Sequence, residues 1–368
     1  MVGALSATSA LADESAPEVT DQAPKKKKKK KKLDFAGRVF VRSALVDTEG
    51  APDTTAQTTL QSARAKADYR SHGVRAELEL EFASKAKVKN AYVQLRVLDD
   101  APRIDVRAGN FKMPFSAIQL ASIWTLPMAD RGLLDNVLVK RMQIAGRAVG
   151  GMVAVDLGGP LKPELRAGMF QGTDDAGNAL AVGSADGYAH DAVVRATIEP
   201  FKGLELGAAG SERAGALLVA VPMVIRHGYA GELDATADVA LGPGQLRAWA
   251  EGMVGTSWLT GGTDMAHVLT RFVEARAIVA YRLGGGERWA RYVELYGLSG
   301  VLDPDRITRN DRVFENTAGI TYGASEVWRV QAEAEFWRLG SAAPIGIAEF
   351  ALGPIDSTTL LVQLGARL

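Results

Sequence analysis

Several features that many enzymes need are missing from this sequence. None of its 368 residues is a cysteine, which excludes disulfides, thiolate metal sites and cysteine nucleophiles. The four histidines lack the spacing of metal ligands; they are His72, His190, His227 and His267. No glycine-rich phosphate loop of the Walker or dinucleotide-binding type is present. The sequence therefore predicts no metal, no cofactor and no enzymatic activity.

Long apolar segments are missing as well. Hydrophobic residues make up 47 % of the chain, yet no uncharged apolar run approaches the roughly 18 residues that a membrane-spanning helix needs. The longest candidate, residues 214–225, has 12 residues and contains Pro222. A helical membrane protein is therefore not predicted. The 39 glycines and 14 prolines suit many short strands joined by turns.

The first 32 residues differ in composition from the rest. Residues 1–12 are small and apolar and end in Ala10-Leu11-Ala12, an A-x-A-like pattern, so we interpret them as the remnant of a signal peptide. A disordered tail of small residues is the alternative. Residues 13–32 are polar and include a run of lysines at 25–32, so we predict a disordered periplasmic tail. Beyond it acidic residues slightly outnumber basic ones, and a nucleic-acid partner is not indicated.

Residues 33–368 alternate between apolar and charged side chains with a period of two. Between 74 and 82 the apolar positions are Val74, Ala76, Leu78, Leu80 and Phe82, and the charged positions are Arg75, Glu77, Glu79 and Glu81. Repeated segments of about ten residues with this alternation are typical of a transmembrane β-barrel. A soluble β-sandwich also alternates, but it rarely sustains so many such segments. We therefore predict an all-β barrel, embedded in the lipid of a bacterial outer membrane.

We predict about 16 antiparallel strands, an even number that returns both chain ends to the periplasmic side. They cover residues 35–46, 60–70, 74–82, 88–98, 103–110, 144–157, 163–172, 188–199, 204–213, 226–240, 245–257, 267–283, 288–299, 313–323, 327–339 and 358–368. Tight turns alternate with mostly longer connections, as outer-membrane barrels place short turns on one side and long loops on the other. The longest connection, 111–143, is then the third extracellular loop.

The last predicted strand alternates up to the final residue. Its apolar positions are Leu360, Val362, Leu364, Ala366 and Leu368. A closing strand of this kind is what outer-membrane assembly machinery recognises, so this machinery is a predicted partner. The terminal aromatic residue usual in such strands is replaced by Leu368.

Three short motifs resemble the phosphate-selective porin O and P family. Residues 109–116 read GNFKMPFS, residues 168–172 read GMFQG with Gln171 in place of the family's Asn, and Arg195 precedes Pro200-Phe201 in an R-x-x-x-x-P-F pattern. The resemblance runs from about residue 33 to residue 368. It implies a sixteen-stranded, usually trimeric anion pore whose third extracellular loop, here 111–143, folds inward.

The site of a porin is a set of charges along a water-filled path. Arg and Lys side chains facing that path lower the energy of anions. The predicted strands place a basic ladder on the lumen side: Arg38, Arg42, Arg64, Lys66, Arg70 and Arg75. The constriction is predicted to contain Lys112, Arg131, Lys140, Arg141 and Arg147, with Lys112 and Arg131 at the narrowest point. We expect small anionic solutes, phosphate or other oxyanions among them, to diffuse through passively.

Two alternatives remain open at this point. An acidic wall shares the lumen side on the later strands: Glu232, Asp234, Asp238, Glu251, Glu274, Glu294, Glu333 and Glu335. Unpaired arginines give anion selectivity, whereas arginines paired with carboxylates give little net selectivity. The second alternative is a different function, in which a barrel with a plugged lumen serves as a structural anchor or adhesin.

Overall fold

The structure is a computed structural model, and it describes most of residues 32–368. The described residues are 32–48, 54–83, 85–138, 144–171, 189–217, 224–257, 270–285, 290–306, 309–324, 327–340 and 355–368. The predicted signal-peptide remnant and all but Lys32 of the predicted tail lie outside these residues and stay predictions.

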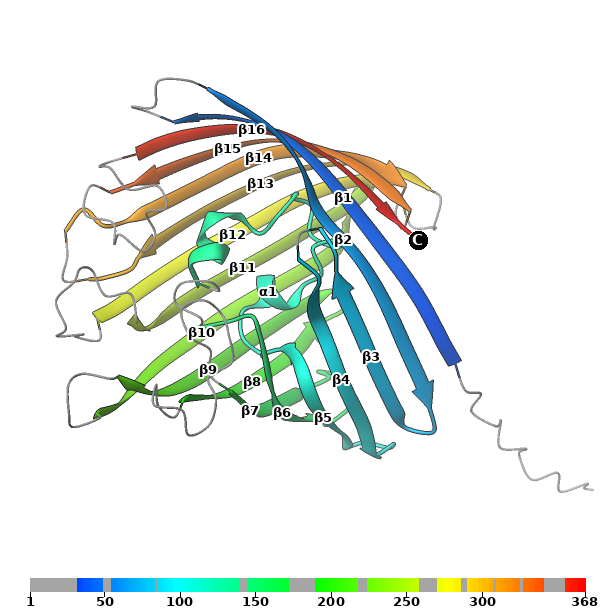
Figure 1. The fold of residues 1–368 in the computed structure, drawn as a ribbon. Helices are drawn as coiled ribbons and strands as arrows, with labels where there is room; N and C mark the ends of the chain where they lie inside the picture. Colours follow the sequence, from blue (N-terminus) through cyan, green and yellow to red (C-terminus); the bar gives the residue numbers. More distant parts are fainter. Residues whose placement is uncertain are drawn as a thin grey trace, which may run out of the picture. The chain divides into compact units, whose positions relative to one another are not determined.

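Sixteen antiparallel strands form a closed barrel in which every strand pairs with its neighbours in the chain (Figure 1). The strands are β1 (Lys32–Thr48), β2 (Thr55–Ser71), β3 (Val74–Glu81), β4 (Lys87–Leu98), β5 (Arg103–Lys112), β6 (Arg147–Asp156), β7 (Glu164–Gln171), β8 (Ala189–Phe201), β9 (Leu204–Leu217), β10 (Val224–Leu241), β11 (Gly244–Ser257), β12 (Thr270–Gly284), β13 (Arg291–Asp303), β14 (Val313–Ala324), β15 (Trp328–Leu339) and β16 (Ile355–Arg367). β1 pairs with β16 from Arg38 opposite Arg367 to Thr48 opposite Ser357, which closes the ring. The predicted fold class is confirmed.

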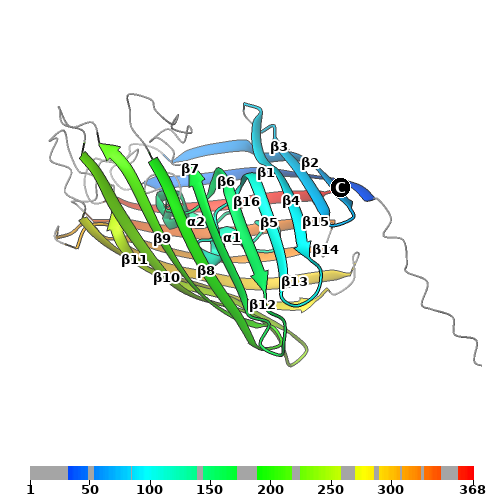
Figure 2. The same cartoon turned by 90° about the horizontal axis from the view of Figure 1, so that it is seen from below.

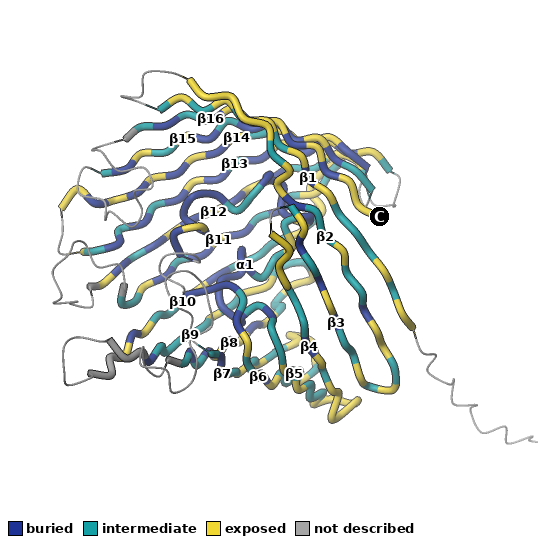
Figure 3. Tube along the Cα trace, viewed as in Figure 1, coloured by how far each residue is buried: buried dark blue, intermediate teal, exposed yellow. Residues whose placement is uncertain are grey.

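The strands carry apolar side chains outward and polar side chains inward. In β16, Leu360 and Val362 are 53 % and 52 % exposed, whereas Gln363 between the outward positions is fully buried. Figure 3 shows the same alternation of exposed and buried positions along β13 to β16. A soluble sandwich buries its apolar face, because removal of apolar surface from water is what stabilises its core. The outward apolar face therefore contradicts the soluble alternative and suits a lipid environment.

Short connections lie at one end of the barrel, together with the start of β1 and the end of β16. The connection between β2 and β3 is His72-Gly73, with φ of 45° and 82°. Such left-handed pairs match the twist of a two-residue hairpin, and glycine adopts them without strain. The prediction of separate strands over 60–70 and 74–82 is thereby confirmed.

The connection between β5 and β6, residues 113–146, is called the lumen loop below. Its described part contains two short helices, α1 (Ala117–Leu120) and α2 (Gly132–Asn136). α1 contacts β10 and β11, and α2 contacts β13 and β14, so the loop lies inside the ring of strands (Figure 2). No helix in the described ranges is long and apolar enough to cross a membrane.

Candidate functional site

Carboxylates of the acidic wall hold the lumen loop by its backbone. Glu232 accepts hydrogen bonds from the N–H groups of Ser116 and Ala117 at 2.6 and 3.0 Å. Glu315, which the sequence did not single out, accepts from the N–H groups of Leu133 and Leu134 at 2.7 and 3.1 Å. The first N–H groups of a helix have no partner within the helix. These carboxylates therefore cap α1 and α2 and fix both against the barrel wall.

Two further acidic residues of the same wall contact the loop. Glu251 accepts a hydrogen bond from the hydroxyl of Ser116 at 2.9 Å, and Glu333 accepts one from the N–H of Ala129 at 2.9 Å. Other members of the wall bind arginines of the barrel, as Asp234 of β10 binds Arg195 of β8 at 2.7 Å. Most of the acidic wall is thus engaged with the loop and with arginines of the later strands.

Arginines of the barrel hold the carbonyl groups of the same loop. Arg329, on β15, is 2 % exposed and donates to the carbonyls of Ile123, Trp124 and Leu126 at 2.9, 3.0 and 2.8 Å. Its guanidinium also lies over the ring of Trp124 at 5.1 Å. Hydrogen bonds from a charged donor are stronger than neutral ones, and desolvation makes their loss costly.

Apolar side chains also pack the lumen loop against the barrel wall. Phe115, Leu134 and Ile118 are fully buried, and they pack in two clusters that include Phe272 of β12 and Leu298 of β13. The loop therefore fills the side of the lumen that faces β8 to β15. Water and solutes are left with the opposite side, along β1 to β7.

A cavity of about 890 Å³ occupies that opposite side. Twelve Arg or Lys side chains line it against five Asp or Glu side chains, counted over the described residues. The basic ones are Arg38, Arg64, Lys66, Arg75, Arg96, Arg103, Arg107, Lys112, Arg131, Arg147, Arg166 and Arg367, and the acidic ones are Glu77, Glu79, Asp105, Asp130 and Glu164. The lining therefore carries a clear excess of positive charge, which favours anions.

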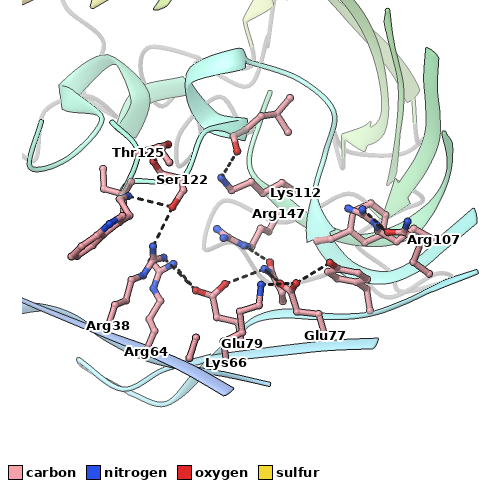
Figure 4. Close-up of a pocket in the computed structure, with 18 of the residues that line it drawn as sticks. Arg38, Arg64, Lys66, Glu77, Glu79, Arg107, Lys112, Ser122, Thr125 and Arg147 are labelled. Atoms are coloured by element: carbon pink, nitrogen blue, oxygen red, sulfur yellow. Dashed lines mark hydrogen bonds and ion pairs between the residues drawn. The ribbon is translucent and has the colours of Figure 1, made fainter. Parts of the chain in front are cut away.

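Four of the six ladder residues line this cavity, and all four form ion pairs with carboxylates of β2 and β3. Figure 4 labels three of them, Arg38, Arg64 and Lys66. Arg38 binds Glu79 at 3.3 Å and Arg64 binds Glu79 and Glu81 at 3.1 and 2.6 Å. Lys66 binds Glu77 at 2.8 Å, and Arg75 binds Asp68 and Glu77 at 2.6 and 2.7 Å. The carboxylates of β3 thus neutralise most of the ladder.

The other two ladder residues do not line the cavity. Arg42 binds Asp130 of the lumen loop at 2.7 Å, so it anchors the loop. Arg70 binds Asp68 at 2.9 Å beside the turn at Gly73, and its side chain is 57 % exposed. Their charges are compensated as well.

Three of the residues predicted for the constriction line the cavity without a carboxylate partner in the described part of the chain: Lys112, Arg131 and Arg147. Lys112 donates to the carbonyls of Gln119, Leu120 and Ala121, and Arg131 donates to those of Ile118 and Ala121. Arg147 lies opposite Lys112 in the β5–β6 ladder and donates to the side-chain carbonyl of Asn90 at 2.8 Å. Lys140 and Arg141 lie outside the described residues.

The surroundings of Arg131 shift its pKa without removing its charge. Burial lowers the pKa of its guanidinium, and the neighbouring Asp135 carboxylate opposes that shift. Burial raises the pKa of Asp135, and the Arg276 guanidinium opposes that shift in turn. A guanidinium keeps its proton through such changes, since its pKa starts far above neutrality.

Five cavity-lining arginines were not predicted as site residues: Arg96, Arg103, Arg107, Arg166 and Arg367. Arg107 is the most informative, because its guanidinium lies over the rings of Tyr92 and Phe111 at 4.6 and 5.3 Å and has no carboxylate partner among the described residues. It donates to the side-chain carbonyl of Gln94 at 2.8 Å. The period-two alternation of residues 103–107 would have placed it on the lumen face.

No arrangement of His, Asp and Glu in the described ranges is suited to hold a metal ion. The lining offers guanidinium and ammonium groups to a solute, and five of these have no carboxylate partner among the described residues: Arg107, Lys112, Arg131, Arg147 and Arg367. The four that belong to the β4–β6 side of the lining or to the lumen loop, Arg107, Lys112, Arg131 and Arg147, are called the free-cation group below.

Comparison with known proteins supports the fold. No family model matches the chain, and no curated protein matches it in sequence. The outer-membrane channel DcaP of Acinetobacter baumannii is 11 % identical over 91 % of this chain and 97 % of its own, with a TM-score of 0.61. An anion-selective porin from Comamonas acidovorans is 14 % identical over 92 % of this chain and 100 % of its own, with a TM-score of 0.57. OprB of Pseudomonas putida is 9 % identical over 91 % and 94 %, with a TM-score of 0.58. The chain is similar in fold to these outer-membrane porins, and no sequence match supports the phosphate-selective subfamily.

Proposed function

We propose that this chain is a porin of a bacterial outer membrane that lets small solutes diffuse passively and prefers anions. The outward apolar face supports the membrane location, since lipid-facing residues of outer-membrane barrels are apolar. The similarity in fold to outer-membrane porins supports the channel function. A channel of this kind binds no cofactor and catalyses no bond chemistry.

The excess of basic over acidic side chains around the cavity carries the anion preference. Anions are drawn to a path lined by positive charge, and a low-dielectric wall focuses that field. The free-cation group supports this preference, because its members line the cavity without a carboxylate partner among the described residues. The ion pairs of the ladder contribute a local dipole instead, whose field falls off faster than that of a single charge.

Planar-bilayer recording tests both parts of this proposal. Purified protein is expected to give stepwise ion conductance and, in a potassium chloride gradient, a reversal potential of the sign that anion flow produces. A reversal potential of the opposite sign would remove the anion preference and leave the pore. Complete lack of conductance from folded, heat-modifiable protein would refute the porin function. It would support the alternative function, a structural anchor with a plugged lumen. The dense packing of the lumen loop is the observation that favours this alternative.

Three finer points belong to the same proposal. The solute includes phosphate or other oxyanions, as the resemblance to the O and P family implies; added phosphate should then reduce chloride conductance at millimolar concentration.

The barrel assembles as a homotrimer, as one structural neighbour, OmpT of Vibrio cholerae, is described in a trimer form. The barrel-assembly machinery recognises the closing strand β16. Cross-linking in intact membranes tests the trimer, and a band at the mass of a monomer alone would contradict it.

A further inference from the structure

The fourth strand differs in chemistry from the third, although the two lie side by side. The lumen face of β3 carries Glu77, Glu79 and Glu81, whereas the lumen face of β4 carries Asn90, Tyr92 and Gln94. Glu79 stands directly opposite Asn90 in the β3–β4 ladder, and Gln94 stands directly opposite Arg107 in the β4–β5 ladder. A strand of acids is thus followed by a strand of neutral hydrogen-bonding groups.

Asn90 joins the acidic strand to the constriction. Its amide nitrogen donates to Glu77 and Glu79 at 2.8 and 3.0 Å, and its amide oxygen accepts from Arg147 at 2.8 Å. The reverse orientation of the amide would set an oxygen against two carboxylates and an NH₂ group against a guanidinium, so these partners determine the orientation. The amide holds Arg147 in place and at the same time separates it from Glu77 and Glu79.

Gln94 has the same relation to Arg107. Its side-chain oxygen accepts from two nitrogens of that guanidinium, at 3.2 and 2.8 Å. A glutamate there would reach the same two nitrogens in a fork-to-fork ion pair. The amide gives the guanidinium a defined orientation over Tyr92 without cancelling its charge.

We infer that Asn90 and Gln94 are positioning residues that determine ion selectivity, because each orients an arginine through a neutral amide and leaves its positive charge available to anions. This inference rests on the proposed porin function. It distinguishes two groups of arginines: those held by carboxylates on β3, which are structural, and those held by amides on β4, which act on the solute.

The test uses substitutions that change an amide into a carboxylate of nearly the same shape. Asn90→Asp and Gln94→Glu, separately and together, are introduced into the full chain, and the reversal potential is measured in a potassium chloride gradient. Gln94→Glu is expected to lower the ratio of anion to cation permeability by about threefold, since a unit of charge a few ångströms from the path acts on both ions with opposite sign. Asn90→Asp is expected to lower it by less, because Glu77 and Glu79 beside the new carboxyl favour its protonated form. The double variant is expected to lower it further.

Gln245→Glu is the matched control. Gln245 lies on the same face of β11 as Arg247 and does not line the cavity, so the same added charge there should change the permeability ratio by much less. Asn90→Leu removes the hydrogen bonds without adding charge, and it is expected to lower the ratio by less than Asn90→Asp. Heat-modifiable migration on a gel checks that each variant is folded.

The results separate this inference from the proposed function. Conducting channels whose ratio is unchanged in both carboxylate variants would overturn the role of Asn90 and Gln94 while leaving the porin intact. An equal loss in Asn90→Leu and Asn90→Asp would overturn it too, since geometry rather than charge would then be responsible. Lack of conductance in the unaltered protein would refute the porin itself.

Discussion

Removal of an ion pair and removal of a free cation should affect selectivity differently, although each involves a cavity-lining base. Lys66 and Glu77 both line the cavity and lie 2.8 Å apart, so Lys66→Gln with Glu77→Gln leaves the charge of the lining unchanged. Arg147→Gln removes one positive charge that no described carboxylate compensates. The double variant should therefore keep the anion preference, and the single variant should lose part of it.

The size of the difference follows from Coulomb's law. A unit charge roughly 6 Å from an ion in water contributes about 0.7 kcal/mol, and screening near 0.1 M salt reduces this to about 0.4 kcal/mol. Anions and cations respond with opposite sign, so Arg147→Gln should shift their permeability ratio by about 0.8 kcal/mol, close to fourfold. The dipole of the Lys66–Glu77 pair contributes about 0.2 kcal/mol at the same distance, which is less than a twofold change.

Reversal potentials in a salt gradient measure these permeability ratios for the unaltered protein, the double variant and Arg147→Gln. Single-channel conductance shows whether each pore stays open. Lys66→Gln alone serves as the internal control. It leaves Glu77 without its lysine, so it should lower the anion preference about as much as Arg147→Gln does. If the pair deletion lowers the ratio as far as Arg147→Gln, the distinction between compensated and free cations is wrong.

Three further predictions concern the loop, the pH dependence and the outer face. Arg329→Met should leave carbonyls of the lumen loop without a donor, at a cost of roughly 3 kcal/mol; we expect a lower temperature of the heat-modifiable transition and a larger conductance, and unchanged values of both would contradict the anchoring role. Burial, with the neighbouring Asp303 carboxylate, raises the pKa of Asp311 to about 6, so the stability that its protonated form contributes is lost as the pH rises through that value. Asp311→Asn should therefore raise the unfolding temperature more at about pH 7.5 than at about pH 5, and an equal effect at both would count against it. Leu295→Arg places a charge on the outward face of β13, where the leucine is 58 % exposed, and should destabilise insertion into lipid vesicles by about 2–4 kcal/mol; His72→Arg in a turn is the control, and equal folding of the two variants would argue against a lipid-facing belt at β13.

The fold could be predicted from the sequence because the barrel separates two environments along every strand. Each of the sixteen predicted strands overlaps one in the structure, since alternation between lipid and lumen imposes the same period throughout. One difference lies where the alternation fades. β9 extends to Leu217, whereas the prediction ended at residue 213, because Ala214 to Leu217 contains small and apolar residues with no polar face.

Lys112, Arg131 and Arg147 were among the residues predicted for the constriction, but the alternation could not tell that they lack a carboxylate partner while the ladder residues have one. Alternation tells which face a side chain occupies, but the partner depends on the register between strands. Lys66 stands opposite Glu79, and Arg64 stands opposite Glu81, which brings each base within reach of the β3 carboxylates. The cluster of bases on the first strands was therefore predicted to favour anions, whereas the register between β2 and β3 places those bases in ion pairs.

The acidic wall illustrates a second limit of counting charges along a sequence. Glu232, Glu251 and Glu333 accept hydrogen bonds from N–H or O–H groups of the lumen loop, and backbone donors leave no trace in the amino-acid composition. A carboxylate that is buried against such donors contributes to the position of the loop and faces little of the solute path. The charge that a solute meets is consequently set by the lining of the cavity, where bases exceed acids, and not by the near-balance of charges over the barrel as a whole. An anion preference can therefore arise in a barrel whose sequence carries slightly more acidic than basic residues.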